Sequence, residues 1–160
     1  MSELRDFLTS DHERLDRLLW NALVDEDSYR EFRSGLLWHI GVEEKILFPI
    51  VRRERGEWEV LRQLHRDHAA LGALLMPPPS GAEIEQIRAI LEAHNPLEED
   101  RGGFYEVVEQ LAAQELSSLM EKVRAFPPVR VAPHADTEVT RWSIEELVRQ
   151  AEEGRRSLKS

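Results

Sequence analysis

The stretch HIGVEEKILFP, residues 39–49, places a histidine and a glutamate four positions apart within a helical pattern of apolar residues. Because residues at i and i+4 lie one above the other on a helix, His39 and Glu43 share one face. Leu36 and Ile46 continue that face in both directions. The stripe therefore points an imidazole and a carboxylate toward the core of the predicted fold.

The same spacing returns in HNPLEE, residues 94–99, and a second motif occurs twice, as DHERL at 11–15 and DHAAL at 67–71. The histidines of the two motifs are 27 residues apart in the first copy and 26 in the second. Two helical hairpins with one pattern are expected to pack into one bundle. The candidate ligands of the repeat are His12, His39, Glu43, His68, His94 and Glu98.

Apolar residues recur at helical spacing along most of the chain, and no alternating strand pattern competes with them. The pattern predicts helices over about 4–22, 29–54, 57–76 and 82–98. Ser28 with Glu31 and Ser80 with Glu83 are expected capping boxes, and Pro49 is expected to interrupt the second helix near its end. Short connections make neighbouring helices antiparallel. The predicted fold is all-α, an antiparallel up-down-up-down four-helix bundle with a C-terminal helical extension.

The C-terminal third is predicted to contain a trailing amphipathic stretch over 104–126, after a bend at Gly102–Gly103. This stretch either continues the fourth helix or forms a fifth, and its apolar stripe either covers the bundle or makes a homodimer through residues 104–126. Residues 127–141 are expected to be a linker. A short helix capped at Ser143 then runs to about Glu153, before a polar, frayed end. Residues 1–126 would thus form the bundle with its trailing helix, and 127–160 the linker and short C-terminal helix.

The amino-acid composition excludes several kinds of metal or disulfide site and disfavours several kinds of binding partner. The chain has 160 residues, which fits one domain, and no cysteine, which excludes disulfides, iron–sulfur clusters and thiolate zinc sites. A net charge of −10 disfavours nucleic acid as a partner. No apolar run reaches the length of a signal peptide or of a membrane span. We therefore expect a cytoplasmic protein without a nucleic-acid or membrane partner.

The candidate ligands are also predicted to lie at similar heights in the bundle. His12 lies 14 residues before the turn near 26 and His39 lies 13 after it, while Glu43 and His68 lie 13 before and 12 after the turn near 56. At about 1.5 Å per residue, these groups come within one helical turn of each other. The last pair is less balanced, because His68 lies 11 residues before the break near 79 and His94 lies 15 after it.

A lone histidine on an apolar stripe is more often a hydrogen-bonded core residue than a ligand, but here six polar side chains share one level. Burying two carboxylates without partners would cost several kcal/mol each, so we expect cations among them. Imidazole with carboxylate suits iron, manganese, zinc or copper. Six ligands exceed one tetrahedral zinc. They suit two octahedral ions bridged by both glutamates, with positions left for a small molecule.

These motifs resemble the hemerythrin-like, or HHE cation-binding, domain family over roughly residues 1–105. The resemblance implies a four-helix bundle around two iron ions in an oxo- or hydroxo-bridged di-iron centre. It implies His12 as the ligand on the first helix and His68 on the third. The second and fourth helices would supply one histidine and one glutamate each, namely His39 with Glu43 and His94 with Glu98.

The sequence also departs from that family. Oxygen-carrying hemerythrins place two histidines four apart on the third helix, whereas His65 and His68 are three apart. His65 is thus a fifth nitrogen ligand, a residue that supports a ligand, or an exposed side chain. Pro96 is expected to kink the fourth helix, and His134 is expected to be exposed. Nothing in the spacing requires Tyr29 or Tyr105 to approach the metals.

The leading functional prediction is a non-haem di-iron protein that binds or senses dioxygen, nitric oxide or another redox signal. Its partner would be a small diatomic molecule or peroxide. The absence of a separate catalytic set favours binding over catalysis. A di-iron enzyme for repair of nitrosative or oxidative damage, or for peroxide or nitric oxide turnover, remains the first alternative. An iron store or an interaction module is the second.

Overall fold

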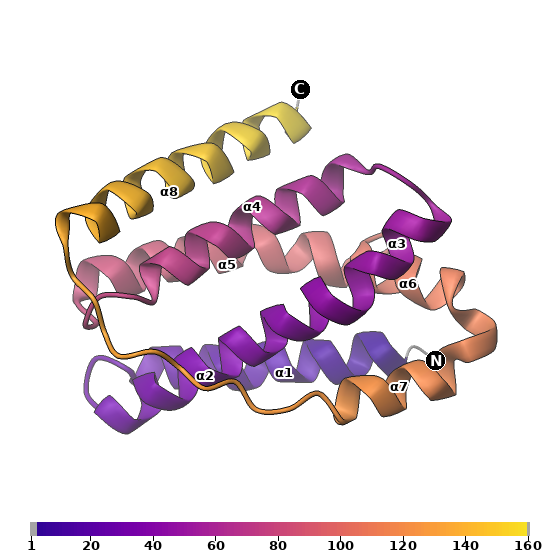
Figure 1. Ribbon diagram of the computed structural model, residues 1–160, viewed down its shortest axis with the longest axis horizontal. Helices are drawn as coiled ribbons and strands as arrows, with labels where there is room; N and C mark the ends of the chain where they lie inside the picture. The colour runs from indigo at the N-terminus through magenta and orange to yellow at the C-terminus, as the bar shows by residue number, and fades with distance from the viewer. Residues whose placement is uncertain (1–2, 160) are drawn as a thin grey trace.

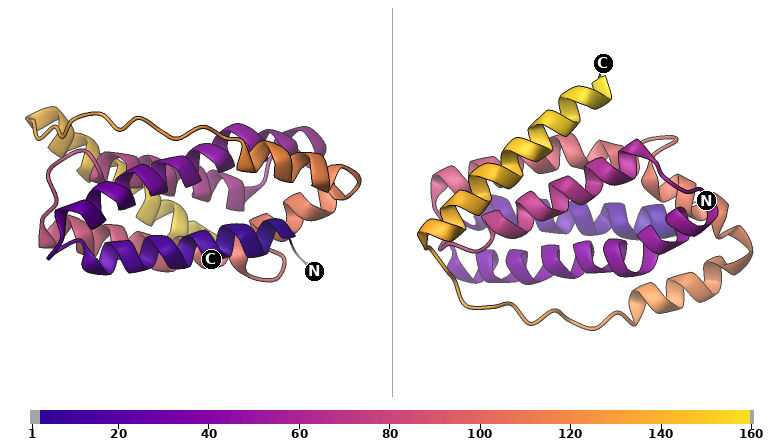
Figure 2. Two further views of the ribbon diagram at one scale, coloured as in Figure 1. Left: turned by 90° about the horizontal axis from the view of Figure 1, so that it is seen from below. Right: turned by 45° about the horizontal axis from the view of Figure 1, so that its top comes forward.

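The computed structural model describes residues 3–159, and within that range the chain is helical and contains no strand. The all-α prediction is confirmed. The long helices α1 (Glu3–Asn21), α2 (Glu26–Val42), α4 (Glu59–Leu74) and α5 (Gly81–Glu99) run along the length of the molecule side by side (Figure 1, Figure 2). Helix α1 packs on α2 and α5, and α4 packs on α5. The up-down-up-down order stays a prediction.

The start of α2 differs from the predicted capping box at Ser28. Asp25 is the N-cap, and its carboxylate accepts a hydrogen bond from the Asp27 amide at 3.1 Å. The Ser28 hydroxyl donates to the same carboxylate at 2.8 Å instead of capping the helix. An aspartate is at least as good an N-cap as serine. The helix therefore begins three residues earlier than the sequence pattern indicated.

The second predicted helix is continuous in space but changes its winding before Pro49. Helix α2 passes into the π-helical segment η1 (Glu43–Leu47), and α3 (Phe48–Glu54) follows. The Phe48 amide donates to the Glu43 carbonyl, five residues back. A proline has no amide proton and its ring crowds the carbonyl four residues earlier, and a wide turn accommodates both. The expected interruption is thus a π turn at the candidate ligand Glu43.

Helix α5 begins as expected, and the kink expected at Pro96 does not divide it. Ser80 is its N-cap, and the Ser80 side chain accepts a hydrogen bond from the Glu83 amide at 3.5 Å. The helix continues as one element through Pro96 to Glu99. His94 and Glu98 therefore remain one helical turn apart, on the face that is directed to the core.

The stretch over 104–126 is separate from α5 and is itself divided. It forms α6 (Phe104–Leu111), the short 3₁₀ turn η2 (Ala113–Glu115) and α7 (Leu116–Arg124), at the end of the molecule where the chain begins (Figure 1). The apolar side chains Tyr105, Val108, Leu119 and Val123 are buried within the same chain. The stripe thus covers the bundle, and a homodimer through these residues stays a prediction.

The final helix is longer than predicted. Helix α8 (Glu138–Lys159) begins five residues before Ser143 and continues past Glu153. The Thr137 hydroxyl accepts a hydrogen bond from the Thr140 amide at 3.1 Å and takes the capping role expected of Ser143. The linker before α8 runs back along α2 (Figure 1). It is attached there by the Trp38 indole, which donates to the Phe126 carbonyl at 2.8 Å.

Two apolar clusters fill the interior, and the candidate ligands lie between them. One cluster contains Leu15 and Leu19 of α1, and the other contains Leu4 and Leu8 of the same helix. His12 lies between Leu8 and Leu15 on the buried face. The polar layer is therefore closed by packed side chains toward both ends of the bundle. Among residues 3–159, no helix is long and apolar enough to cross a membrane.

Candidate metal centre

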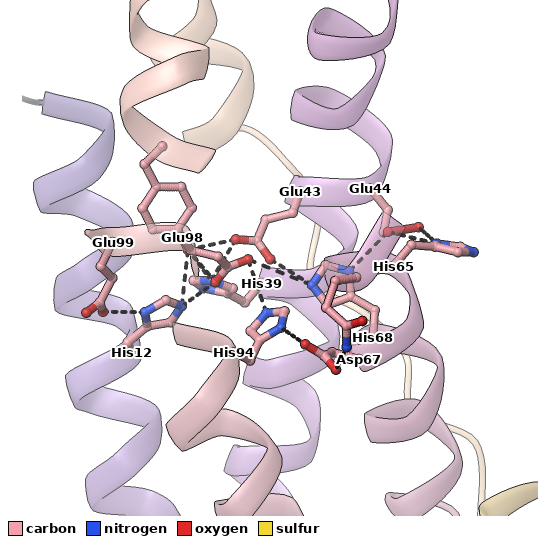
Figure 3. A network of polar contacts seen from close by, with 12 residues as sticks. His12, His39, Glu43, Glu44, His65, Asp67, His68, His94, Glu98 and Glu99 are labelled. Carbon is pink, nitrogen blue, oxygen red and sulfur yellow. Dashed lines mark hydrogen bonds and ion pairs between the residues drawn. The ribbon is translucent and has the colours of Figure 1, made fainter. Parts of the chain in front are cut away.

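The structure brings all six candidate ligands together in the interior (Figure 3). None is more than 7% exposed, and the two glutamates are fully buried. They come from every helix of the repeat: His12 from α1, His39 from α2, Glu43 from η1, His68 from α4, and His94 with Glu98 from α5. Their convergence is the arrangement that the sequence repeat predicted.

The six side chains form two overlapping groups of four. The donor atoms within each group lie within 4.8 Å of one another. The first group is His12, His39, Glu43 and Glu98, and the second is Glu43, His68, His94 and Glu98. Because Glu43 and Glu98 belong to both groups, the arrangement is compatible with two cations that share two carboxylates.

Each of the four imidazoles has its Nδ1 atom bonded to a carboxylate that is not a candidate ligand. The pairs are Asp11 with His39 (2.8 Å), Glu44 with His68 (3.0 Å), Asp67 with His94 (2.9 Å) and Glu99 with His12 (2.5 Å). Metal-binding histidines almost always donate their second ring nitrogen in this way, which fixes the ring orientation. The Nε2 atoms are thereby left facing the centre.

Three buried atoms at the second group lack a hydrogen-bond partner among the described residues: Glu43 Oε1, His68 Nε2 and Glu98 Oε2. His68 Nε2 lies 3.2 Å from Glu43 Oε1, but the two are not aligned as a hydrogen bond. Orphaned polar atoms in a protein interior are costly. A cation that binds all three would remove that cost, so the donor set fits a metal ion.

Tyr105 of α6 also belongs to the cluster, although nothing in its spacing along the sequence required this. The Tyr105 hydroxyl oxygen lies 3.1 Å from His12 Nε2 and 3.0 Å from His39 Nε2. It donates to Glu43 Oε2 at 2.7 Å and lies 3.1 Å from Glu98 Oε1. All four neighbours are donor atoms of the first group. The residue follows α5 on a separate helix, so helical spacing could not reveal it.

A glycine turn directs Tyr105 into the centre. Gly102 has a φ of +78°, in the left-handed region that favours glycine. A Cβ atom on Gly103 would lie 2.7 Å from the Asp100 carbonyl oxygen and 2.8 Å from that of Leu97. The chain can therefore reverse tightly after α5 only with these residues, and α6 begins directly after the turn. The bend expected at Gly102–Gly103 is confirmed, and it positions a side chain of the cluster.

Surrounding carboxylates raise the pKa values of the histidines. Burial alone lowers the pKa of His39, but the charge of Glu43 and the hydrogen bond with Asp11 outweigh it and raise the pKa to about 10. For His94, burial is likewise outweighed by Glu98 and Asp67, and the pKa is about 9. Without a metal these imidazoles carry protons at neutral pH. A metal ion must displace those protons when it binds.

Burial raises the pKa of Tyr105 well above its usual value, and the charges of Glu43 and Glu98 add to the effect. The pKa of Glu98 moves in the opposite direction. Burial raises it, but the positive charge of His94 and the nearby imidazoles of His12 and His68 lower it well below the usual range. The metal-free cluster thus pairs anionic carboxylates with cationic imidazoles around a protonated phenol.

The remaining histidines lie outside the two groups. The His65 side chain is 60% exposed, and its Nδ1 atom lies 2.8 Å from Glu44, the carboxylate that orients His68. Of the alternatives for His65, the structure favours support of a ligand. His134 is exposed as expected, and its ring stacks on Tyr29. Tyr29 lies away from the centre, and its hydroxyl has no hydrogen-bond partner in the described chain.

A cavity of about 220 Å³ leads to the cluster between α1 and α5. Its inner wall includes His12, His39 and His94, and its outer part includes the exposed residues Glu13 and Glu92. Between them the lining is apolar and comes from Leu15, Leu19, Leu36, Leu71 and Leu91. At about 30 Å³ per water molecule, the volume suits a few small molecules and no large substrate.

Comparison with protein families gives a match to the hemerythrin HHE cation-binding domain over residues 3–123. The chain belongs to this family. The matched range extends beyond the resemblance at residues 1–105 and includes α6 and α7, so Tyr105 lies inside the hemerythrin domain. Neither the curated proteins nor the solved structures give a significant match. The hemerythrin domain and the buried His/Glu cluster together are compatible with cation binding.

Proposed function

We propose that this hemerythrin domain is an antiparallel up-down-up-down bundle that holds two iron ions and binds or senses a small redox molecule. The ions would be bridged by Glu43 and Glu98 and by an oxo or hydroxo group. The observation that carries the proposal is the pair of four-donor groups that share two buried carboxylates. Nitrogen and oxygen donors together suit iron, and the chain has no thiolate to offer.

The two groups indicate which residues would bind each iron ion. His12 and His39 would hold one iron, His68 and His94 would hold the other, and the two glutamates would bind both. Bound iron would supply the one-electron chemistry and the open coordination that dioxygen or nitric oxide needs. The chain itself orients the imidazoles through four further carboxylates, here called the outer carboxylates: Asp11, Glu44, Asp67 and Glu99. The apolar clusters on either side separate the centre from solvent toward both ends of the bundle.

The cavity favours uncharged ligands. Its outer lining includes the carboxylates Glu13, Asp16 and Glu92, together with the guanidinium of Arg88. A rim of negative charge repels anions and attracts cations. Dioxygen, nitric oxide and hydrogen peroxide are neutral and small enough to pass the leucine-lined neck. Iron(II) itself would be attracted by the same rim.

The test is reconstitution with Fe(II) under anaerobic conditions, followed by exposure to dioxygen, nitric oxide or peroxide. We expect about two irons per chain and a change in visible absorption with at least one of the three. The Glu98→Gln variant should lose the bound iron and the absorption change, because Glu98 belongs to both groups of candidate ligands. Glu92→Gln is the matched control, since Glu92 is exposed on the same helix and lines only the cavity.

The outcomes separate the alternatives. A protein that binds no iron, or whose spectrum is unchanged by all three molecules, would contradict the proposal. Repeated turnover of peroxide or nitric oxide above free-iron controls would indicate an enzyme instead of a binding protein. An iron content far above two per chain would indicate storage.

A further inference from the structure

We infer that Tyr105 is a fifth ligand of the cation held by His12 and His39, so that a small molecule binds at the other cation. This inference rests on the proposed function, because it requires the two groups to hold metal ions. It adds a phenol oxygen from α6 to a donor set that otherwise comes from the repeated helices.

The spacing of the atoms around Tyr105 supports the inference. Its oxygen lies 2.7–3.1 Å from His12 Nε2, His39 Nε2, Glu43 Oε2 and Glu98 Oε1. Around an octahedral ion with donors at about 2.1 Å, neighbouring donors are about 3 Å apart. One vertex of an octahedron has four such neighbours. The Tyr105 oxygen stands in that relation to the whole first group.

Hydrogen bonding alone explains the position of Tyr105 only in the metal-free protein. There the phenol oxygen lies at hydrogen-bonding distance from both imidazole Nε2 atoms, and the phenol donates its one proton to Glu43. Metal binding removes the protons from the imidazole Nε2 atoms. The Nε2 lone pairs would then bind the cation, and neither imidazole could donate a hydrogen bond to the phenol oxygen. A bond from the oxygen to the cation replaces its O–H bond and releases that proton to solvent.

The second group has no equivalent of Tyr105. Its unpartnered atoms are Glu43 Oε1, His68 Nε2 and Glu98 Oε2, and no phenol or further imidazole is bonded to them in residues 3–159. With the bridging oxygen proposed above, the first cation has six ligands and the second has five. An octahedral ion accepts six, which leaves one open position, at the cation of His68 and His94. The cavity wall includes His94 of this group together with His12 and His39 of the first group, so the open position would adjoin the cavity.

The glycine turn fixes the position of Tyr105 beside the cluster. The Gly102 φ of +78° and the close approach of Gly103 to the Asp100 and Leu97 carbonyls place α6 directly against the cluster. Phe104, the residue before, packs edge-on against Phe48 with ring centres 5.2 Å apart. Tyr105 is fully buried. The phenol is therefore held in place before any cation binds.

Optical and resonance Raman spectroscopy of the ferric protein test the inference. A phenolate bound to ferric iron gives a visible charge-transfer band, and excitation in that band enhances tyrosine ring modes. The chain has only two tyrosines, so Tyr29→Phe is a matched control. We expect wild type and Tyr29→Phe to show the band, and Tyr105→Phe to lose it while still binding two irons. Ring-deuterated tyrosine should shift the enhanced modes in the wild-type protein, which needs no variant to fold.

The outcomes are distinct for the two proposals. Two irons per chain with no tyrosine modes, or identical spectra for wild type and Tyr105→Phe, would overturn the inference and leave the di-iron proposal intact. Loss of the band in Tyr29→Phe alone would also overturn it. Absence of iron from the wild-type protein would overturn both.

Discussion

Each histidine of the centre is oriented by a carboxylate from a different helix. Asp11 of α1 bonds His39 of α2, and Glu44 of η1 bonds His68 of α4. The second copy of the repeat is arranged in the same way. An imidazole held by a carboxylate keeps its tautomer and is a stronger metal ligand. The carboxylates of Asp11, Glu44, Asp67 and Glu99 would therefore influence the affinity of the proposed centre for a metal, although none of them belongs to the two groups.

Asp11→Asn should weaken iron binding by about 10- to 100-fold, the usual effect of removing such a partner. The amide keeps the size of the side chain but loses the charge that holds His39 Nδ1 at 2.8 Å. Competition with a chromogenic Fe(II) chelator measures the change. Asp27→Asn is the control, because Asp27 is exposed and its side chain pairs only with Arg30. Equal affinity in Asp11→Asn and wild type would refute the role of the carboxylate.

The candidate ligands could be predicted because helical periodicity places them on one face and the repeat places them at one height. Asp11, Glu44, Asp67 and Glu99 were visible within the same motifs. The histidine that each carboxylate bonds could not be predicted, because each of these pairs joins neighbouring helices and depends on how the helices are rotated about their axes. The position of Tyr105 could not be predicted for a further reason. It depends on the tight turn at Gly102–Gly103 and on the direction that α6 takes after this turn.

At the scale of elements, α8 packs closely on α4 and reaches Asp67, the carboxylate that bonds His94. The Gln63 amide of α4 donates to Asp67 and to the Ala151 carbonyl of α8, both at 2.9 Å. Arg155 of α8 also bonds Asp67, at 3.0 Å. A Cβ atom on Gly154 would collide with Gln63 and Arg66. The last helix thus contributes to the side of the bundle that holds His94.

Gly154→Val should lower the free energy of unfolding of the metal-free protein by about 1–3 kcal/mol, the usual cost of overpacking. The valine would displace the buried amide of Gln63 and break its hydrogen bonds to Asp67 and the Ala151 carbonyl. Gly72→Ala is the control, since a Cβ there meets nothing within 4 Å. It should stabilise the helix by up to about 1 kcal/mol. Urea unfolding measures both, and a neutral Gly154→Val would show that α8 is loosely attached.

The helices of the repeat could be predicted within a few residues, but two features of the other elements could not. The π turn at Glu43–Leu47 depends on how the chain accommodates Pro49 while Glu43 stays directed to the centre. The length of α8 depends on Thr137 as its cap and on packing against α4. Its polar last turns look frayed in isolation, and tertiary contacts stabilise them.

At the scale of the whole molecule, the metal-free protein should lose stability as the pH rises. His39 and His94 have folded-state pKa values of about 10 and about 9, above the usual value of 6.5. A raised folded-state pKa contributes stability that is full below about pH 6.5 and is lost as the pH approaches the folded value. The loss should therefore lie between about pH 6.5 and about pH 10.

Urea unfolding of the metal-free protein across this range measures the effect. The midpoint should fall steadily as the pH rises. His39→Gln should reduce the slope, and His134→Gln should leave it unchanged, because His134 is exposed and lies outside the cluster. A midpoint that is constant or rises with pH would show that the imidazoles are neutral in the folded protein.

The most direct test of the account is a crystal structure of the iron-loaded protein with anomalous data collected at the iron edge. The account predicts two anomalous peaks in each chain, one among His12, His39 and the two glutamates, and one among His68, His94 and the same glutamates. A single peak, peaks at the protein surface, or a cluster without any anomalous signal would contradict the shared two-cation centre.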